Sequence, residues 1–184
     1  MDTAQQIAVG IVVIVAIAIV LLARRVAGIL YRTRVAEGFR GDASDLSRRV
    51  AQSIGEIAAV IDGVRRRTSD GGAIRDSLRV ARGGVDRYIE EVEALEVPAS
   101  AAVTKRRMIE ELERAGRALE MVEHGCDLAR DGDRRERGAE ADTAIKRGYL
   151  NLVHSRESFQ ELAREAIAEA EEASPVRRFG RPHI

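Results

Sequence analysis

Apolar residues recur at alternating intervals of three and four along most of residues 44–173, and this spacing restricts the chain to packed helices. The rhythm is clearest in 74–95 and 108–129, and it is also present in 46–64. Residues spaced in this way share one face of an α-helix, close to the 3.5-residue repeat of bundles and coiled coils. No stretch alternates with period two for long enough to indicate a strand. The sequence therefore predicts an all-α protein.

Four helices are expected, because turn signals separate four apolar seams. Asp42 or Ser44 can cap the first helix, the cluster 68–72 precedes the second, and Pro98 lies near the start of the third. The segment 131–133 separates the third helix from the fourth, which ends before Pro175. The predicted seam residues are Leu46, Val50, Ile54, Ile57, Ile61 and Val64; Ile74, Leu78, Ala81, Val85, Tyr88, Val92 and Leu95; Met108, Leu112, Ala115, Leu119, Val122, Cys126 and Ala129; and Ile145, Tyr149, Leu152, Phe159, Leu162, Ala166 and Ala170.

Short connections make consecutive helices antiparallel neighbours, so residues 42–173 are predicted to form an antiparallel four-helix bundle. Its last two helices are longer and extend beyond the first pair. The alternative is a set of helical coiled-coil hairpins that complete their core by oligomerising. Gly148 and Ser155 permit a close helix approach, whereas Gly83 and Gly84 indicate either a kink or a close contact.

Residues 7–23 contain no charged or polar side chain and predict a single transmembrane helix. Seventeen helical residues span about 25 Å, close to the hydrocarbon thickness of roughly 30 Å, and flanking arginines can extend the span. A buried core helix is the first alternative, but the rest of the chain is too small to enclose it. A cleaved signal peptide is the second, but basic residues follow the apolar run instead of preceding it.

Orientation follows from four arginines that lie after the apolar run, namely Arg24, Arg25, Arg32 and Arg34. The positive-inside rule places that side in the cytoplasm. The expected organisation is a short extracytoplasmic segment 1–6, the span 7–23, a basic juxtamembrane segment 24–41, the cytoplasmic bundle and a basic tail 174–184. The predicted location is a prokaryotic cell membrane, which the protein crosses once.

Charge is distributed unevenly although the formal net charge is zero. Residues 1–40 have a balance of +3, residues 41–173 a balance of −6, and residues 174–184 a balance of +3. An even number of antiparallel helices brings both basic ends to the membrane side of the bundle. We therefore expect contacts with the bilayer, including anionic lipid headgroups, or alternatively a disordered tail without a partner. The candidate residues are Arg24, Arg25, Arg32, Arg34, Arg177, Arg178 and Arg181.

Catalytic and metal-binding patterns are not found in the sequence. One cysteine excludes an intramolecular disulfide, and neither a nucleotide-binding loop nor a catalytic triad spacing is present. His124 and Cys126 are two residues apart and cannot chelate one ion on a helix. Cys126 continues an apolar seam, and His124 and His154 are expected on the helix surface. No catalytic residue, cofactor or metal is predicted.

These features favour a membrane-anchored helical scaffold or protein-interaction module without enzymatic activity. Its expected partners are the lipid bilayer and either another protein or a second copy of the chain. Neutral net charge and six aromatic residues argue against nucleic-acid binding. The alternative is a membrane-associated signalling or regulatory component with a cytoplasmic or lipid-borne input, because only about six residues are expected outside the cell.

Overall fold

The computed structural model describes residues 3–66, 74–130 and 135–172. Within these ranges, side chains 3–16, 18, 26, 29–33, 135 and 136 are not described. All described regular structure is helical: α1 Thr3–Arg65, α2 Arg75–Ala94, the 3₁₀ turn η1 Ala99–Ala101, α3 Ala102–Arg130 and α4 Arg135–Glu172. The expectation of an all-α protein is confirmed.

Helix α1 is one continuous helix of 63 residues. The predicted helix start at Asp42 or Ser44 is therefore wrong, and the juxtamembrane segment 24–41 is helical throughout. No proline interrupts this part of the chain. The glycines at 28, 38 and 41 each cost about 1 kcal/mol relative to alanine, which the surrounding helix-forming residues tolerate.

No helix is both long enough and apolar enough to cross a membrane among the residues that the structure describes. The predicted span 7–23 includes residues 7–16 and 18, whose side chains lie outside that description. Membrane crossing by this segment stays a prediction.

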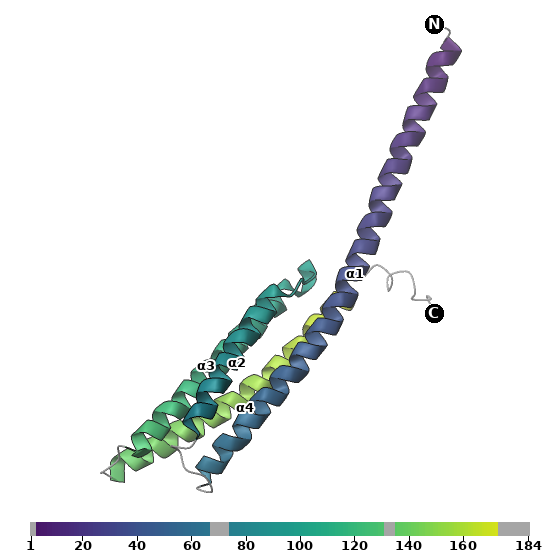
Figure 1. The fold of residues 1–184 in the computed structure, drawn as a ribbon. Coiled ribbons are helices and arrows are strands. Elements are labelled where there is room, and N and C mark those ends of the chain that lie inside the picture. Colours follow the sequence, from purple (N-terminus) through teal and green to yellow (C-terminus); the bar gives the residue numbers. More distant parts are fainter. Residues whose placement is uncertain (1–2, 67–73, 131–134, 173–184) are drawn as a thin grey trace, which may run out of the picture.

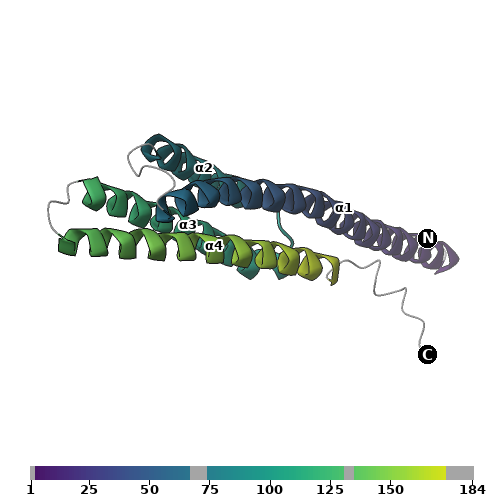
Figure 2. The ribbon, with the colours of Figure 1, turned by 90° about the horizontal axis from the view of Figure 1, so that it is seen from below.

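The four long helices form an antiparallel bundle in which each helix contacts the two beside it. Helix α1 packs on α2 and α4, and α3 packs on α2 and α4. The N-terminal part of α1 stands clear of the other helices (Figure 1). At the opposite end, α3 and α4 extend beyond the last turn of α1 and the first turn of α2 (Figure 2). The bundle therefore has a shared middle, a protruding α1 and a two-helix tip.

The core contains nearly all the predicted seam residues. Those of α2 are all buried or packed against the core, and in α3 and α4 only Ala129 is exposed. Phe39 and Ala43 are buried as well, so the bundle begins one turn earlier than predicted. Because α1 has no break at Asp42, its apolar face continues onto Phe39 and adds a large side chain to the core.

Helices α3 and α4 approach each other closely at two glycines, Gly125 and Gly148. A Cβ atom added to Gly148 would lie 2.5 Å from Val122 Cγ2 and 2.7 Å from the Ala118 carbonyl oxygen. One added to Gly125 would lie 3.0 Å from the Ala141 carbonyl oxygen. The predicted close approach at Gly148 is confirmed.

Gly83 and Gly84 behave differently, since an added Cβ atom would meet nothing within 4 Å at either position. Of the two alternatives predicted for this pair, a kink or a close helix contact, the close contact is therefore wrong. Helix α2 continues through both residues, and Leu78 and Val85 on either side keep its apolar face in the core.

Candidate interaction groove between α1 and α2

The bundle starts on α1 and finishes at the end of α4, and these two points lie at the same end of the domain. The N-terminal part of α1 projects from that end. Arg40 Nη1 in α1 lies 3.4 Å from Glu171 Oε1, close to the end of α4. Near the same end, Ser100 donates a hydrogen bond to the Glu169 carbonyl oxygen and Thr104 donates one to the Glu169 carboxylate. The fourth helix thus returns to the level at which α1 leaves the bundle, as the even helix count predicted.

From Arg34 towards the N-terminus, the described side chains of α1 are exposed. Ile17 and the apolar residues 19–22 are exposed, with fractions between 54% for Ile17 and 66% for Leu22. Arg24 and Arg25 follow them and are exposed too. Isolated exposed apolar residues are common on protein surfaces, but a contiguous group indicates contact with a membrane or another protein.

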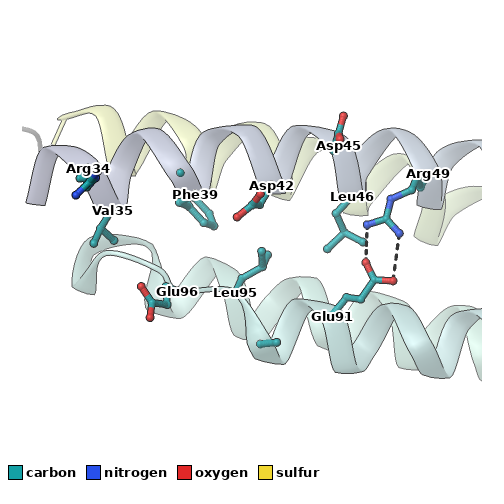
Figure 3. Close-up of a pocket in the computed structure, with 12 residues that line it drawn as sticks. Arg34, Val35, Phe39, Asp42, Asp45, Leu46, Arg49, Glu91, Leu95 and Glu96 are labelled. Atoms are coloured by element: carbon teal, nitrogen blue, oxygen red, sulfur yellow. Dashed lines mark hydrogen bonds and ion pairs between the residues drawn. The ribbon is translucent and has the colours of Figure 1, made fainter. Parts of the chain in front are cut away.

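A groove of about 610 Å³ opens between α1 and the C-terminal end of α2 (Figure 3). Its volume lies within the range of ordinary ligand sites. Helix α2 ends at Ala94, whereas α1 continues past it, so α1 has no α2 side chains opposite its upper turns. The residues that line the groove are Arg34, Val35, Gly38, Phe39, Asp42, Asp45, Leu46, Arg49, Glu91, Ala94, Leu95 and Glu96.

One end of the groove is closed by a two-pronged ion pair between Arg49 and Glu91. Arg49 Nη1 donates to Glu91 Oε1 at 3.1 Å, and Nη2 donates to Oε2 at 2.5 Å. The same guanidinium lies over the ring of Tyr88, 5.8 Å from its centroid. The hydrogen bonds from Arg49 lower the pKa of Glu91, and they raise the pKa of Arg49 in return. Both groups are charged at neutral pH and join α1 to α2.

The end of α2 beside the groove is held by Lys105 of α3. Its Nζ donates hydrogen bonds to the carbonyl oxygens of Glu93 at 2.7 Å and Leu95 at 2.8 Å. The last carbonyls of a helix have no partner within the helix, so this lysine satisfies them and stops α2 at a defined place. The groove is therefore bordered by an ordered helix end.

The arginines predicted to contact lipid headgroups lie in different places. Arg24 and Arg25 are exposed on the free part of α1, whereas Arg34 lines the groove. The side chain of Arg32 and the tail arginines Arg177, Arg178 and Arg181 lie outside the described residues. The groove was missed because a seam pattern shows which residues face inward but not where a neighbouring helix stops.

A second groove, of about 470 Å³, lies between α3 and α4 at the two-helix tip. His124 lines it together with Met121, Leu128 and Arg147. His154 is exposed on α4, and Cys126 is buried. In the described part of the chain, no three His, Cys, Asp or Glu residues are grouped so as to hold a metal ion.

Arg156 of α4 lies beside α1. Its guanidinium lies 3.8 Å from Glu157 of its own helix and reaches over Gly55 of α1. Ser155 beside it is fully buried, and no hydrogen-bond partner is recorded for its hydroxyl group. Gly55 leaves room for this guanidinium, since an added Cβ atom would lie 3.4 Å from Arg156 Nη1.

Comparison of this chain with family models, with curated proteins and with solved structures found no match.

Proposed function

We propose that the protein is a membrane-anchored helical interaction module without catalytic activity. In this proposal residues 7–23 cross the bilayer once, and the bundle stands on the cytoplasmic side. The supporting observation is the exposure of Ile17 and of the apolar residues 19–22 in α1, which belong to an uncharged run that starts at Ile7. Burial in lipid removes this apolar surface from water, which stabilises the inserted state by about 25 cal/mol for each Å² of apolar surface.

The juxtamembrane arginines support the orientation. Arg24 and Arg25 immediately follow the apolar run and are exposed, which suits contact with anionic headgroups at about 1 kcal/mol for each basic residue near the surface. Arg34 lies ten residues beyond Arg24, about 15 Å along the helix, and faces the groove. We therefore assign headgroup contact to the first pair rather than to all four juxtamembrane arginines.

Membrane fractionation tests the anchoring. The full chain should stay with membranes after an alkaline carbonate wash, whereas a variant with Ile14→Asp and Ala18→Asp should be released. An aspartate in the middle of a span costs roughly 3 kcal/mol, so two suffice to abolish insertion. Release of the unmodified chain by the wash would disprove the proposal.

Cysteine labelling tests the orientation. In a Cys126→Ser background, Thr3→Cys should react with an impermeant maleimide in intact cells. Val80→Cys, on an exposed position of α2, should react only after permeabilisation. The reverse pattern would place the bundle outside the cytoplasm. Stoichiometric iron or zinc in the purified protein would contradict the non-catalytic assignment, and a stable partner captured after crosslinking in membranes would support it.

A signalling or regulatory role is the second candidate, and the continuity of α1 favours it. One helix includes residues 7–23 and reaches Arg65 in the bundle. Any rotation or tilt of the upper part of α1 is therefore applied directly to a core helix. A change in the distance between spin labels on α2 and α4 after a change in lipid composition would support this role over a static scaffold.

A further inference from the structure

The groove between α1 and α2 combines an acidic rim with apolar walls. Arg49 and Glu91 neutralise each other at one end. Of the remaining rim residues, Arg34 is basic, whereas Asp42 and Glu96 are acidic.

Asp45 is a third acid on the rim, and it bonds Arg48 at 2.7 Å. The walls are formed by Val35, Phe39, Leu46 and Leu95, which lie between the charged groups (Figure 3). The groove therefore suits a segment that carries positive charges next to an apolar side chain.

The tail of this chain has that composition. Residues 174–184 contain three arginines and no acid, and Phe179 follows two of the arginines directly. The tail lies outside the described residues, and the helix that precedes it ends at Glu172. Its charge is opposite to that of the groove rim, and its aromatic side chain matches the apolar walls.

The position of the end of α4 brings the tail close to the groove. Glu171 contacts Arg40, and Arg40 lies between Gly38 and Asp42 of the groove along α1. Passing around α1, which is about 10–12 Å wide, takes roughly 16–19 Å and needs five or six extended residues. From Arg40 to Ala23, by contrast, is about 25 Å along the helix. The groove is therefore nearer to the end of α4 than the membrane surface at the end of the predicted span.

We propose that the groove between α1 and α2 binds the basic tail 174–184 of the same chain, with Phe179 between the apolar walls and the arginines at the acidic rim. This inference replaces headgroup contact as the role of Arg177, Arg178 and Arg181. It does not rest on the membrane anchoring proposed above, since it concerns contacts within one bundle.

Disulfide crosslinking in the full chain tests the docking. In a Cys126→Ser background, Gly180→Cys places a thiol next to Phe179, and Gly38→Cys places one in the groove. Gly41→Cys is the matched control, because both glycines are exposed on α1 and an added Cβ atom meets nothing within 4 Å at either. Gly41 does not line the groove. Docking raises the local thiol concentration, so the Gly38 pair should oxidise roughly tenfold faster than the Gly41 pair.

Charge reversal provides the second arm. Asp42→Lys together with Glu96→Lys should lower the rate of the Gly38 pair to that of the Gly41 pair, while the helical circular dichroism of the protein stays unchanged. Equal rates for the two pairs in the unreversed chain would overturn the proposal. So would a tail thiol that is protected from alkylation only in anionic nanodiscs and not in neutral ones, because that result assigns the tail to lipid headgroups.

Discussion

The α3–α4 and α1–α2 interfaces join antiparallel neighbours of the same bundle, yet they are built in opposite ways. Helices α3 and α4 share the most extensive interface, and the glycines at 125 and 148 let backbone lie against backbone. Helices α1 and α2 share a much smaller interface, which contains the groove and the ion pair of Arg49 with Glu91. Small residues thus produce a closed interface, whereas an early helix end and charged side chains leave an open one.

Truncation of a large core side chain should separate the two regions most strongly. Phe159→Ala, in the fully enclosed part of the core, should destabilise the protein by about 3–5 kcal/mol because it leaves a cavity. Phe39→Ala should cost only about 2 kcal/mol, because the space it vacates joins the groove and admits water. Urea unfolding measures both losses of stability, with pulsed alkylation of the single buried thiol, that of Cys126, as the readout. Equal losses of stability in the two variants would mean that the groove does not let the core around Phe39 adjust to the missing side chain.

Glycine substitution provides the next largest contrast. Gly148→Ala should destabilise the protein by about 1–3 kcal/mol, because the new methyl group overlaps the Ala118 carbonyl oxygen and backbone atoms cannot rotate away. The matched control is Gly83→Ala in α2, which has open space around it and should stabilise the protein by up to about 1 kcal/mol through helix propensity. The same urea titration reports the opposite signs, and a stabilising Gly148→Ala would show that α3 and α4 can separate without cost.

The smallest expected effect concerns the ion pair that closes the groove. The hydrogen bonds from Arg49 lower the pKa of Glu91. The contribution of this ion pair to folding stability is therefore complete above the ordinary glutamate pKa of about 4.3, and it is lost as pH falls through the lowered pKa. Both side chains are nearly half exposed, so the pair contributes no more than about 1 kcal/mol.

Glu91→Gln should therefore reduce stability at pH 7 by a few tenths to about 1 kcal/mol, and the difference from the unmodified chain should vanish on acidification. Thermal unfolding at a series of pH values measures that difference, and Glu90→Gln on the exposed side of α2 is the control. A difference that persists at low pH would show that Glu91 acts through packing instead of charge.

Local patterning explains why most of the fold was predictable. The seam residues of α2 and α3 are spaced at three and four, and a helix with such a face has to bury it against other helices. Pro98 also lies where expected, just before η1, where its carbonyl oxygen accepts a hydrogen bond from Ala101. The incorrect start at Asp42 has a local cause, since a residue that can cap a helix is equally compatible with a helix that simply continues.

The candidate groove was less predictable, because it depends on which helix ends opposite which. Arg49 and Glu91 are 42 residues apart, and nothing in their local sequence pairs them. Gly83–Gly84 and Gly148 look alike as glycines on predicted helices, but only Gly148 faces a neighbouring backbone. Such distinctions depend on how far each helix extends along its neighbours and on which of its faces meets them.

The sequence by itself determined that the chain is helical, which faces are apolar and that an uncharged run precedes the bundle. These properties follow from the periodicity and composition of neighbouring residues. Only the tertiary structure decided that α1 is continuous, that α3 and α4 share the most extensive interface and that α2 stops short of α1 to leave a groove. Those features depend on how far each helix extends past its neighbours, which is a property of the packed bundle.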